Sequence, residues 1–183
     1  AGEVDFAAYY TGAPDLPTYK AGEAAGNYTT FIAQYLNTSE LVIWLNQDIA
    51  DPFLNSLFTN LDFRVALSVA LNRAQMNEIV FYGLADAHPA TPLRTMEFFR
   101  DEWYNDNLAY DPDRANQLLD AVGLAEKDSE GFRLNPETGE RFSLVVEVGV
   151  QEGTKERLCE LVSNDWRAVG IEGACQVIDG TLQ

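Results

Sequence analysis

Residues 61–80 form the most regular stretch of the chain, and their apolar side chains recur at helical spacing. Side chains three or four positions apart lie one above the other on a helix, so this spacing predicts an amphipathic helix. We expect Asp62 to cap the helix and Gly83 to end it. The predicted buried face consists of Phe63, Ala66, Leu67, Ala70 and Leu71, continued by Ile79 and Val80.

Two further helices are marked by a capping residue at the start and a glycine at the end. Asp111 precedes Pro112, and proline is favoured in the first helical turn, where its N–H would have no partner. This helix is predicted to end at Gly123. Thr154 is expected to cap another helix, which ends at Gly170. Both segments carry an apolar stripe, so each should pack against a core.

The N-terminal quarter predicts strands around one short helix. Residues 1–11 indicate a short edge strand, and residues 15–26 a helix that begins at an aspartate and stops at a glycine. The segments 27–36 and 40–47 are rich in β-branched and aromatic residues, which favours two strands. The second is apolar at five consecutive positions, as is typical of a strand covered on both faces. Residues 48–56 predict a loop or turn.

The C-terminal third predicts a strand–helix–strand unit. Residues 131–150 indicate a hairpin with its turn at 135–139, which contains asparagine, proline and glycine. Residues 171–178 predict a further strand after the intervening helix, and strands joined through a helix run parallel. The alternating apolar positions of the first strand are Phe142, Leu144, Val146 and Val148. Together the elements predict an α/β fold in which helices flank a mixed sheet.

Composition narrows the range of partners. The 183 residues include 12 basic and 29 acidic side chains, which gives a net charge of −17. Nucleic acids bind basic surfaces, so we expect no nucleic-acid partner. No run of about 20 apolar residues is present, so no membrane span is expected. The chain has neither an initial methionine nor a leader pattern, and we expect a mature or excised piece of a longer protein.

Sequence motifs give no support to an enzyme. The chain lacks the nucleophile-elbow, zinc-protease, Walker and dinucleotide-binding patterns. Its one histidine, His88, lies in a predicted loop, where a surface role is more common than catalysis. Asp111 and Asp113 are a pair of carboxylates, but helix capping explains them. We therefore predict no catalytic residues, no cofactor and no metal site.

The two cysteines allow two interpretations. Cys159 and Cys175 show no metal-binding spacing. They can form a disulfide if the protein is exported, or remain as two independent buried thiols. The sequence leaves both alternatives open.

The ordered set of segments resembles the family 5 extracellular solute-binding proteins, the peptide- and oligopeptide-type receptors of ABC importers. The resemblance covers residues 1–178, nearly the whole chain. One departure is Asn72, where the family usually has an aspartate before Arg73. The segments that carry the resemblance are "GEVDFA", "WLNQ", "FRVALSVALNRAQMNEIVFYGLADAHPATP", "YDPDRANQLLDAVGL", "GERFSLVVEV" and "LVSNDWRAVGIEGACQV".

The resemblance implies a fold, a function and a location. The expected fold is one lobe of a type II periplasmic-binding-protein arrangement, with residues 1–40 ending the first lobe and residues 41–183 beginning the second. The expected function is capture of an extended solute, foremost an oligopeptide, and its delivery to a membrane permease. Such a receptor is monomeric and lies in the periplasm or on the outer face of a membrane. It is not an enzyme.

Position within the family also suggests which residues face the ligand. Three segments correspond to ligand-lining segments, and the start of the third helix offers free backbone N–H groups that suit a carboxylate or a sugar hydroxyl. Each residue also has an ordinary structural interpretation as a strand, core, cap or solvated side chain. The candidates are Tyr9, Tyr10, Trp44, Asn46, Gln151, Thr154 and Lys155.

Three alternatives remain at this stage. An oligosaccharide receptor of the same family fits the eight tyrosines and three tryptophans as well as a peptide receptor does. A sensor built on the same lobe, without transport, has the same sequence pattern. A hydrolase with scattered carboxylates needs a close acidic pair in a pocket, which no motif supplies.

Overall fold

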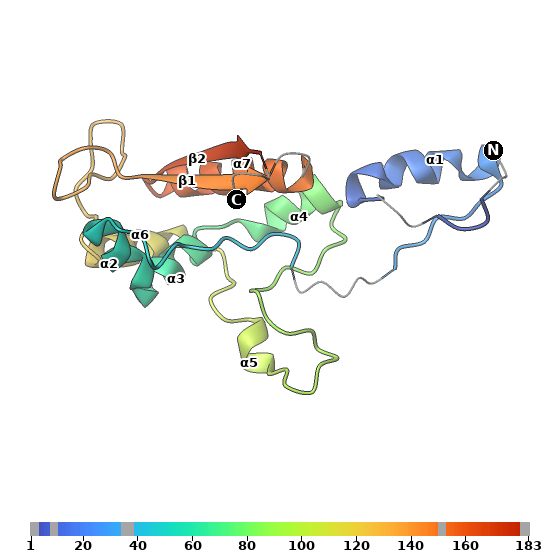
Figure 1. Ribbon diagram of the computed structural model, residues 1–183, viewed down its shortest axis with the longest axis horizontal. Coiled ribbons are helices and arrows are strands. Elements are labelled where there is room, and N and C mark those ends of the chain that lie inside the picture. Colours follow the sequence, from blue (N-terminus) through green and yellow to red (C-terminus); the bar gives the residue numbers. More distant parts are fainter. Residues whose placement is uncertain (1–3, 8–10, 34–38, 150–152, 180–183) are drawn as a thin grey trace.

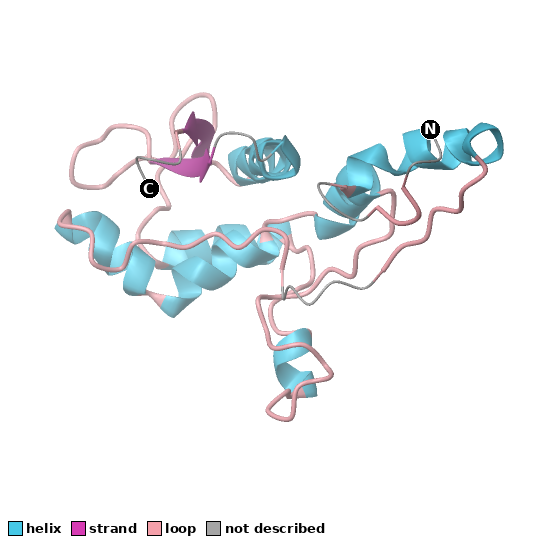
Figure 2. Cartoon of the chain, turned by 45° about the vertical axis from the view of Figure 1, so that its right-hand side comes forward, coloured by secondary structure: helices cyan, strands magenta, loops and turns pink. Residues whose placement is uncertain are grey.

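The structure is a computed structural model that describes residues 4–7, 11–33, 39–149 and 153–179. A layer of helices lies beneath a pair of strands, while α1 and α5 project from this body (Figures 1 and 2). In chain order the elements are η1 (Ala13–Asp15), α1 (Leu16–Gly26), α2 (Pro52–Thr59), α3 (Leu61–Val69), α4 (Arg73–Phe81), α5 (Asp101–Tyr104), α6 (Pro112–Ala121), β1 (Ser143–Gly149), α7 (Gly153–Ala168) and β2 (Glu172–Ile178).

The strand–helix–strand unit is present as predicted. β1 and β2 pair in parallel, with Val146 opposite Cys175, and α7 connects them. The face that was predicted to be apolar is buried at Phe142, directly before β1, and at Leu144 and Val148 within it. A disulfide joins Cys159 of α7 to Cys175 of β2, which decides between the two interpretations of the cysteines.

The core lies between this unit and the helices α2, α3 and α6. The Phe142 ring meets Phe53 and Phe63 edge-on, with centroids 6.1 and 6.0 Å apart. Trp166 of α7 is 2% exposed, and its indole N–H donates to the Leu67 carbonyl of α3 at 3.1 Å. A buried indole needs such a partner for its polar edge, so this bond fixes α7 on α3.

A buried arginine ties the helices to the segment before β1. The Arg133 side chain is 0% exposed. Its Nε donates to the Val169 carbonyl at 2.8 Å, and Nη1 donates to Asp120 Oδ1 at 2.6 Å and to the Leu124 carbonyl. Its Nη2 donates to Asn116 Oδ1 at 2.7 Å and to the Asn116 carbonyl at 3.3 Å. The hydrogen-bonding capacity of the guanidinium is thereby used for internal contacts.

The stretch predicted as one helix is two helices, α3 and α4. Asn60 caps α3 by accepting from the backbone N–H groups of Asp62 at 2.8 Å and Phe63 at 3.4 Å, so the predicted cap at Asp62 is wrong. Asn72 caps α4 and accepts from Gln75 N–H at 3.1 Å. An asparagine side chain that accepts from a backbone N–H two or three residues further on favours a helix start over a helix interior.

Strands were predicted at 27–36, at 40–47 and at 1–11. The described residues of all three ranges have an irregular backbone, so these predictions are wrong there. β-propensity becomes a strand only when a neighbouring strand completes the hydrogen bonds. Residues 52–59 form α2 where a loop was predicted, because Asp51 accepts from Leu54 N–H at 2.9 Å and so caps a helix.

Several local predictions are confirmed. Asp111 caps α6 through Arg114 N–H at 2.9 Å. The hairpin turn closes through Asn135 N–H, which donates to the Glu140 carbonyl at 2.8 Å. The helix predicted at 15–26 is α1, although the Asp15 carboxylate accepts from Gly12 N–H and does not cap it.

In the part of the chain that the structure describes, no helix has the length and apolarity needed to cross a membrane.

The Arg133 contacts make a prediction for stability. Arg133→Met should lower the free energy of unfolding by about 3 kcal/mol, because five acceptor atoms lose their partner, among them the buried carbonyls of Leu124 and Val169. Arg167→Met is the matched control, since Arg167 is exposed on α7, and should change it by less than about 0.5 kcal/mol. Urea unfolding followed by circular dichroism measures both. Equal losses of unfolding free energy in the two variants would show that the hydrogen bonds of Arg133 do not stabilise the fold.

Candidate ligand-binding site

An extended segment before α2 presents one tryptophan to solvent. Leu41, Ile43 and Leu45 pack against the core, so alternate side chains of this segment point inward. Trp44 lies between two of them and is 86% exposed. The prediction of a strand covered on both faces is therefore wrong at Trp44. Its indole is a flat apolar surface held by packed neighbours, which suits stacking against a ligand.

Asn46 forms the turn that follows this segment. Its carbonyl accepts from Ile49 N–H at 3.3 Å, and its Oδ1 accepts from Asp48 N–H at 3.0 Å. The side-chain oxygen is thus used within the turn, whereas the exposed amide NH₂ group is available as a donor.

The start of α7 supplies the second set of predicted residues. α7 begins at Gly153, so Thr154 is its second residue and not its N-cap. Thr154 and Lys155 are both half-buried. The first N–H groups of a helix have no partner within the helix, so they attract an acceptor or an anion.

The predicted residues fall on two described segments of the chain. Trp44 and Asn46 come from the segment before α2, and Thr154 and Lys155 come from α7. The other three candidates, Tyr9, Tyr10 and Gln151, lie outside the described residues.

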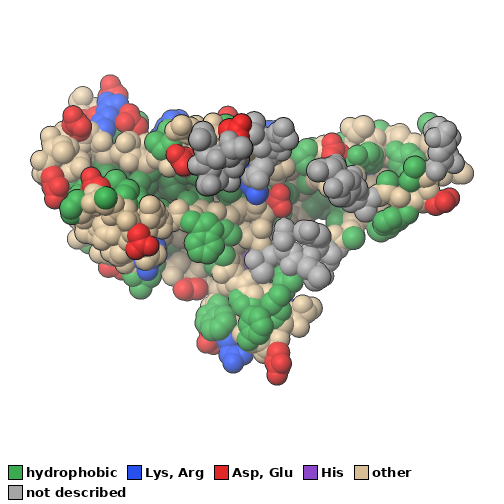
Figure 3. Space-filling model, in the orientation of Figure 1, with side chains coloured by type: hydrophobic (Ala, Val, Ile, Leu, Met, Phe, Trp, Pro, Cys, Tyr) green, Lys and Arg blue, Asp and Glu red, His purple; other side chains and the backbone are tan. Residues whose placement is uncertain are grey.

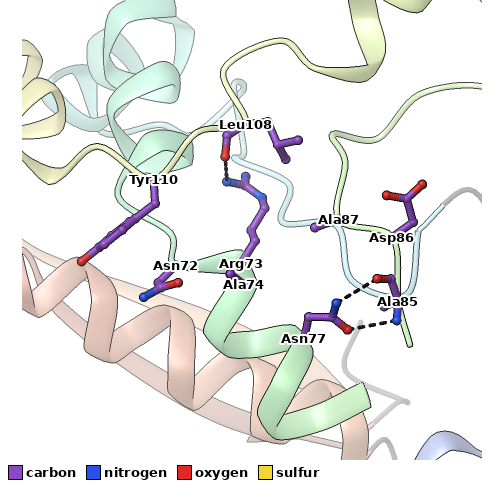
Figure 4. Close-up of a pocket in the computed structure, with 9 residues that line it drawn as sticks. All are labelled: Asn72, Arg73, Ala74, Asn77, Ala85, Asp86, Ala87, Leu108 and Tyr110. Atoms are coloured by element: carbon purple, nitrogen blue, oxygen red, sulfur yellow. Dashed lines mark hydrogen bonds between the residues drawn. The ribbon is translucent and has the colours of Figure 1, made fainter. Parts of the chain in front are cut away.

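A pocket of about 420 Å³ lies elsewhere, between α4 and the segments that lead to and from α5 (Figure 4). This pocket could not be predicted from the sequence, because its walls come from three separate parts of the chain. None of the predicted ligand residues contributes to it. The lining residues are Asn72, Arg73, Ala74, Asn77, Ala85, Asp86, Ala87, Leu108 and Tyr110.

The polar groups of this pocket are mostly used for internal contacts. The Arg73 guanidinium donates to the carbonyl and the hydroxyl of Ser68, both at 2.8 Å, and so holds the end of α3. The Asn77 amide exchanges two hydrogen bonds with the Ala85 backbone, at 2.8 and 2.9 Å (Figure 4). These contacts shape the chain around the pocket, so we assign the pocket a structural role.

Asp165 of α7 connects to the same region. Its Oδ2 accepts from Asn72 N–H at 2.7 Å. Burial raises the pKa of the Asp165 carboxyl, while the hydrogen bond from Asn72 and the charge of Arg73 oppose the rise. Burial also lowers the pKa of Arg73, and Asp165 opposes this shift. An asparagine at position 72 caps α4 without adding a second carboxylate beside Asp165.

His88 is packed and is not a free surface residue. Its ring stacks on the Tyr104 ring with centroids 4.5 Å apart, and its Nδ1 lies 2.7 Å from the Pro89 carbonyl oxygen. The Arg94 guanidinium lies 4.0 Å from the Tyr104 centroid. The Tyr104 hydroxyl donates to Asp86, and burial is the main cause that raises its pKa. These contacts hold the projecting segment around α5.

That segment carries a second group of exposed apolar side chains, visible at the lower tip of the molecule in Figure 3. Phe98 is 61% exposed, Trp103 45% and Met96 36%. Trp103 is therefore a second exposed tryptophan, on a different element from Trp44.

A smaller pocket of about 210 Å³ lies beside the hairpin. Arg141 lines it and forms ion pairs with Asp128 and Glu130, both at 2.6 Å, and with Glu172 at 3.4 Å. Among the described residues, no group of three or more His, Cys, Asp or Glu side chains is placed to hold a metal ion.

The Asp165 carboxyl predicts a pH dependence of stability. A raised pKa means that the folded protein holds this proton more tightly than the unfolded chain does, so the resulting stabilisation is full below about pH 4 and is lost as the pH rises through the raised pKa. Asp165→Asn keeps an acceptor for Asn72 N–H but does not titrate.

The wild type should therefore lose stability relative to Asp165→Asn between about pH 4 and neutrality, as measured by thermal unfolding at several pH values. A constant difference would mean that the Asn72 hydrogen bond and the charge of Arg73 cancel the effect of burial on the pKa, and a change in the opposite direction would mean that they outweigh it.

Comparison with known proteins places the chain in a family. The family model "Bacterial extracellular solute-binding proteins, family 5 Middle" matches residues 1–183. A probable ABC transporter-binding protein of Deinococcus radiodurans is 23% identical over 130 residues, which are 69% of this chain and 21% of that protein. A periplasmic alpha-galactoside-binding protein of Rhizobium meliloti is 26% identical over 140 residues, 75% of this chain and 20% of that protein.

A solved structure supports the same assignment. The oligopeptide-binding protein OppA is 31% identical, with a TM-score of 0.80, over 93% of this chain and 26% of that one. The likeness confirms the predicted α/β fold of the periplasmic-binding-protein type. The chain spans about a fifth of the curated relatives and about a quarter of this solved structure. The chain belongs to the bacterial extracellular solute-binding proteins of family 5.

Proposed function

We propose that this chain is part of a receptor that captures an oligopeptide between two lobes and delivers it to the membrane permease of an ABC importer. Family membership supports a solute receptor and not an enzyme. The 31% identity to the oligopeptide-binding protein OppA favours a peptide as the solute. The receptor acts as a monomer in the periplasm or on the outer face of a membrane.

In this proposal residues 1–40 end the first lobe and residues 41–183 begin the second. Ligand capture then occurs by closure of the two lobes around a hinge. Seven residues form this chain's share of the cleft: Tyr9, Tyr10, Trp44, Asn46, Gln151, Thr154 and Lys155.

One observation carries the proposal, the 86% exposure of Trp44 between two packed neighbours. A tryptophan is a large apolar side chain, and leaving it in water forgoes the stabilisation that its burial would provide. A ligand that covers the indole recovers that stabilisation at the moment of binding.

The start of α7 contributes the polar half of recognition. The N–H groups at a helix start and the positive end of the helix dipole suit the carboxylate of a peptide. The net charge of −17 works against an anionic ligand over long distances, so a neutral or cationic peptide is favoured.

An oligosaccharide is the second candidate solute. The alpha-galactoside-binding relative of Rhizobium meliloti favours it, since the relative is 26% identical to this chain. An exposed indole also stacks on the apolar face of a sugar ring, so Trp44 fits either solute.

A thermal-shift screen of the full-length protein separates the two candidates. Di- to pentapeptides should raise the melting temperature, because a ligand that binds only the folded state stabilises it by mass action. Raffinose and stachyose at equal concentration provide the sugar arm. A shift with the sugars alone would replace the peptide proposal by the sugar one, and no shift with either would reject both.

The role of Trp44 has a matched test. Trp44→Ala should weaken binding of the peptide found in the screen by tenfold or more, about 1.4 kcal/mol, because the ligand loses its stacking surface. Trp103→Ala removes an exposed tryptophan from α5 and should leave the affinity unchanged. Isothermal titration calorimetry measures both. Equal effects of the two substitutions would remove Trp44 from the site.

A further inference from the structure

The segment that follows α1 folds back against the helix through polar contacts. The Lys20 ammonium donates to the Glu23 carboxylate at 2.9 Å and to the Thr30 carbonyl at 2.6 Å. The same carboxylate accepts from Thr30 N–H at 2.6 Å. The Tyr28 hydroxyl donates to the Tyr19 carbonyl at 2.7 Å. These bonds fix the direction in which the next residues leave the helix.

Two glycines of α1 make room for this fold-back. A Cβ added at Gly22 would strike the Tyr28 hydroxyl, and a Cβ added at Gly26 would strike the Tyr28 ring. Glycine weakens a helix, so a position inside one needs a reason. The close approach of the tyrosine supplies that reason at both positions.

The fold-back presents large apolar side chains to solvent. Phe31 and Ile32 are each 64% exposed, and Val4 and Phe6 are 70% and 68% exposed. The rings of Phe6 and Phe31 lie with their centroids 6.1 Å apart, so the two segments form one surface. We call these four side chains the N-terminal apolar surface. Figure 3 shows hydrophobic side chains on this projecting part of the molecule.

The helix beside this surface has no core of its own. α1 contains no buried side chain, whereas α2, α3, α4, α6 and α7 each bury at least two. An isolated helix of 11 residues is marginal in water, and most helical stability in proteins comes from packing. Removing large apolar side chains from water stabilises the folded state, so covering this surface would supply the support that α1 lacks.

We infer that the N-terminal apolar surface is an internal docking surface, covered in the whole protein by a part of the same polypeptide outside residues 1–183. The inference rests on the two-lobed arrangement of the proposed function, in which residues 1–40 end the first lobe. This chain spans 26% of the solved oligopeptide-binding protein OppA, so a polypeptide of that length has ample chain to cover the surface.

The permanence of the cover distinguishes this occupant from others. A membrane permease or a second copy would cover the surface only while it is bound. The free monomeric receptor would then leave α1 without support and expose an apolar patch that promotes association. Docking within one polypeptide avoids both, and it makes residues 4–32 move with the first lobe when the lobes close.

Photocrosslinking in the full-length protein identifies the occupant. Phe31 is replaced by p-benzoylphenylalanine, which keeps an aromatic ring on the surface. Glu137, exposed in the hairpin turn, receives the same replacement as the matched control. Irradiation should join position 31 to a peptide of the same molecule outside residues 1–183, as identified by mass spectrometry, and position 137 should give no such product.

Thiol labelling measures how permanent the cover is. In the folded full-length protein, Phe31→Cys should react with N-ethylmaleimide about a hundredfold more slowly than Glu137→Cys, since reaction requires local opening. The rate should not depend on protein concentration, and both thiols should react equally in urea. Phe6→Cys repeats the measurement on the same surface if Phe31→Cys does not fold.

The other occupants predict different results. A crosslinked dimer, or labelling that speeds up on dilution, would assign the surface to a second copy and overturn the inference. Labelling of Phe31→Cys as fast as that of Glu137→Cys would show a bare surface and overturn it as well, and so would crosslinks confined to residues 1–183.

These measurements use no solute, so they are independent of the thermal-shift screen. A covered surface in a protein that responds to neither peptides nor sugars would support the docking surface and reject the proposed solutes. A bare surface in a protein that binds peptides would overturn the docking surface and leave solute capture standing.

Discussion

The arrangement of the body depends on Arg133, a buried cation whose guanidinium donates hydrogen bonds to acceptors within the protein. The guanidinium of Arg133 reaches α6 through Asn116 and Asp120 and the end of α7 through Val169. Its backbone N–H donates to the Gly170 carbonyl at 2.7 Å. A charge in the interior is tolerated only when such partners replace water. One side chain therefore ties the segment before β1 to α6 and to the residues that follow α7.

Part of this fold could be predicted because its signals are local. The capping of α6 by Asp111 and the alternation along β1 each depend on residues a few positions apart. The break between α3 and α4 could not be predicted in this way. Its apolar pattern is continuous, and the contact that supports the new helix start is a hydrogen bond from Asn72 to Asp165, 93 positions away. The strands predicted before α2 failed for the related reason that pairing requires a second strand, which the composition of one segment cannot supply.

The candidate site, like the fold, could be predicted only in those parts that depend on residues close together in the sequence. Trp44 could be singled out from the sequence, but its apolar surroundings suggested a core residue, and only the packing of Leu41, Ile43 and Leu45 gives it its outward direction. The crosslink between Cys159 and Cys175 depends on a helix and a strand meeting in space, so the sequence left it open. Arg73 lies in a segment that carries the resemblance to the family, yet its contacts with Ser68 show a residue that joins two helices. A pattern that marks a family thus marks its scaffold as often as its ligand site.

The central claim is that the solute contacts the segment around Trp44 and the first turn of α7. Hydrogen–deuterium exchange of the full-length protein, with and without a saturating ligand from the screen, tests it most directly. We predict slower exchange at positions 43–46 and 154–157 in the complex, with little change in α6 and in the segment around α5. Protection confined to the pocket beside Arg73, or absent from both predicted segments, would contradict the account.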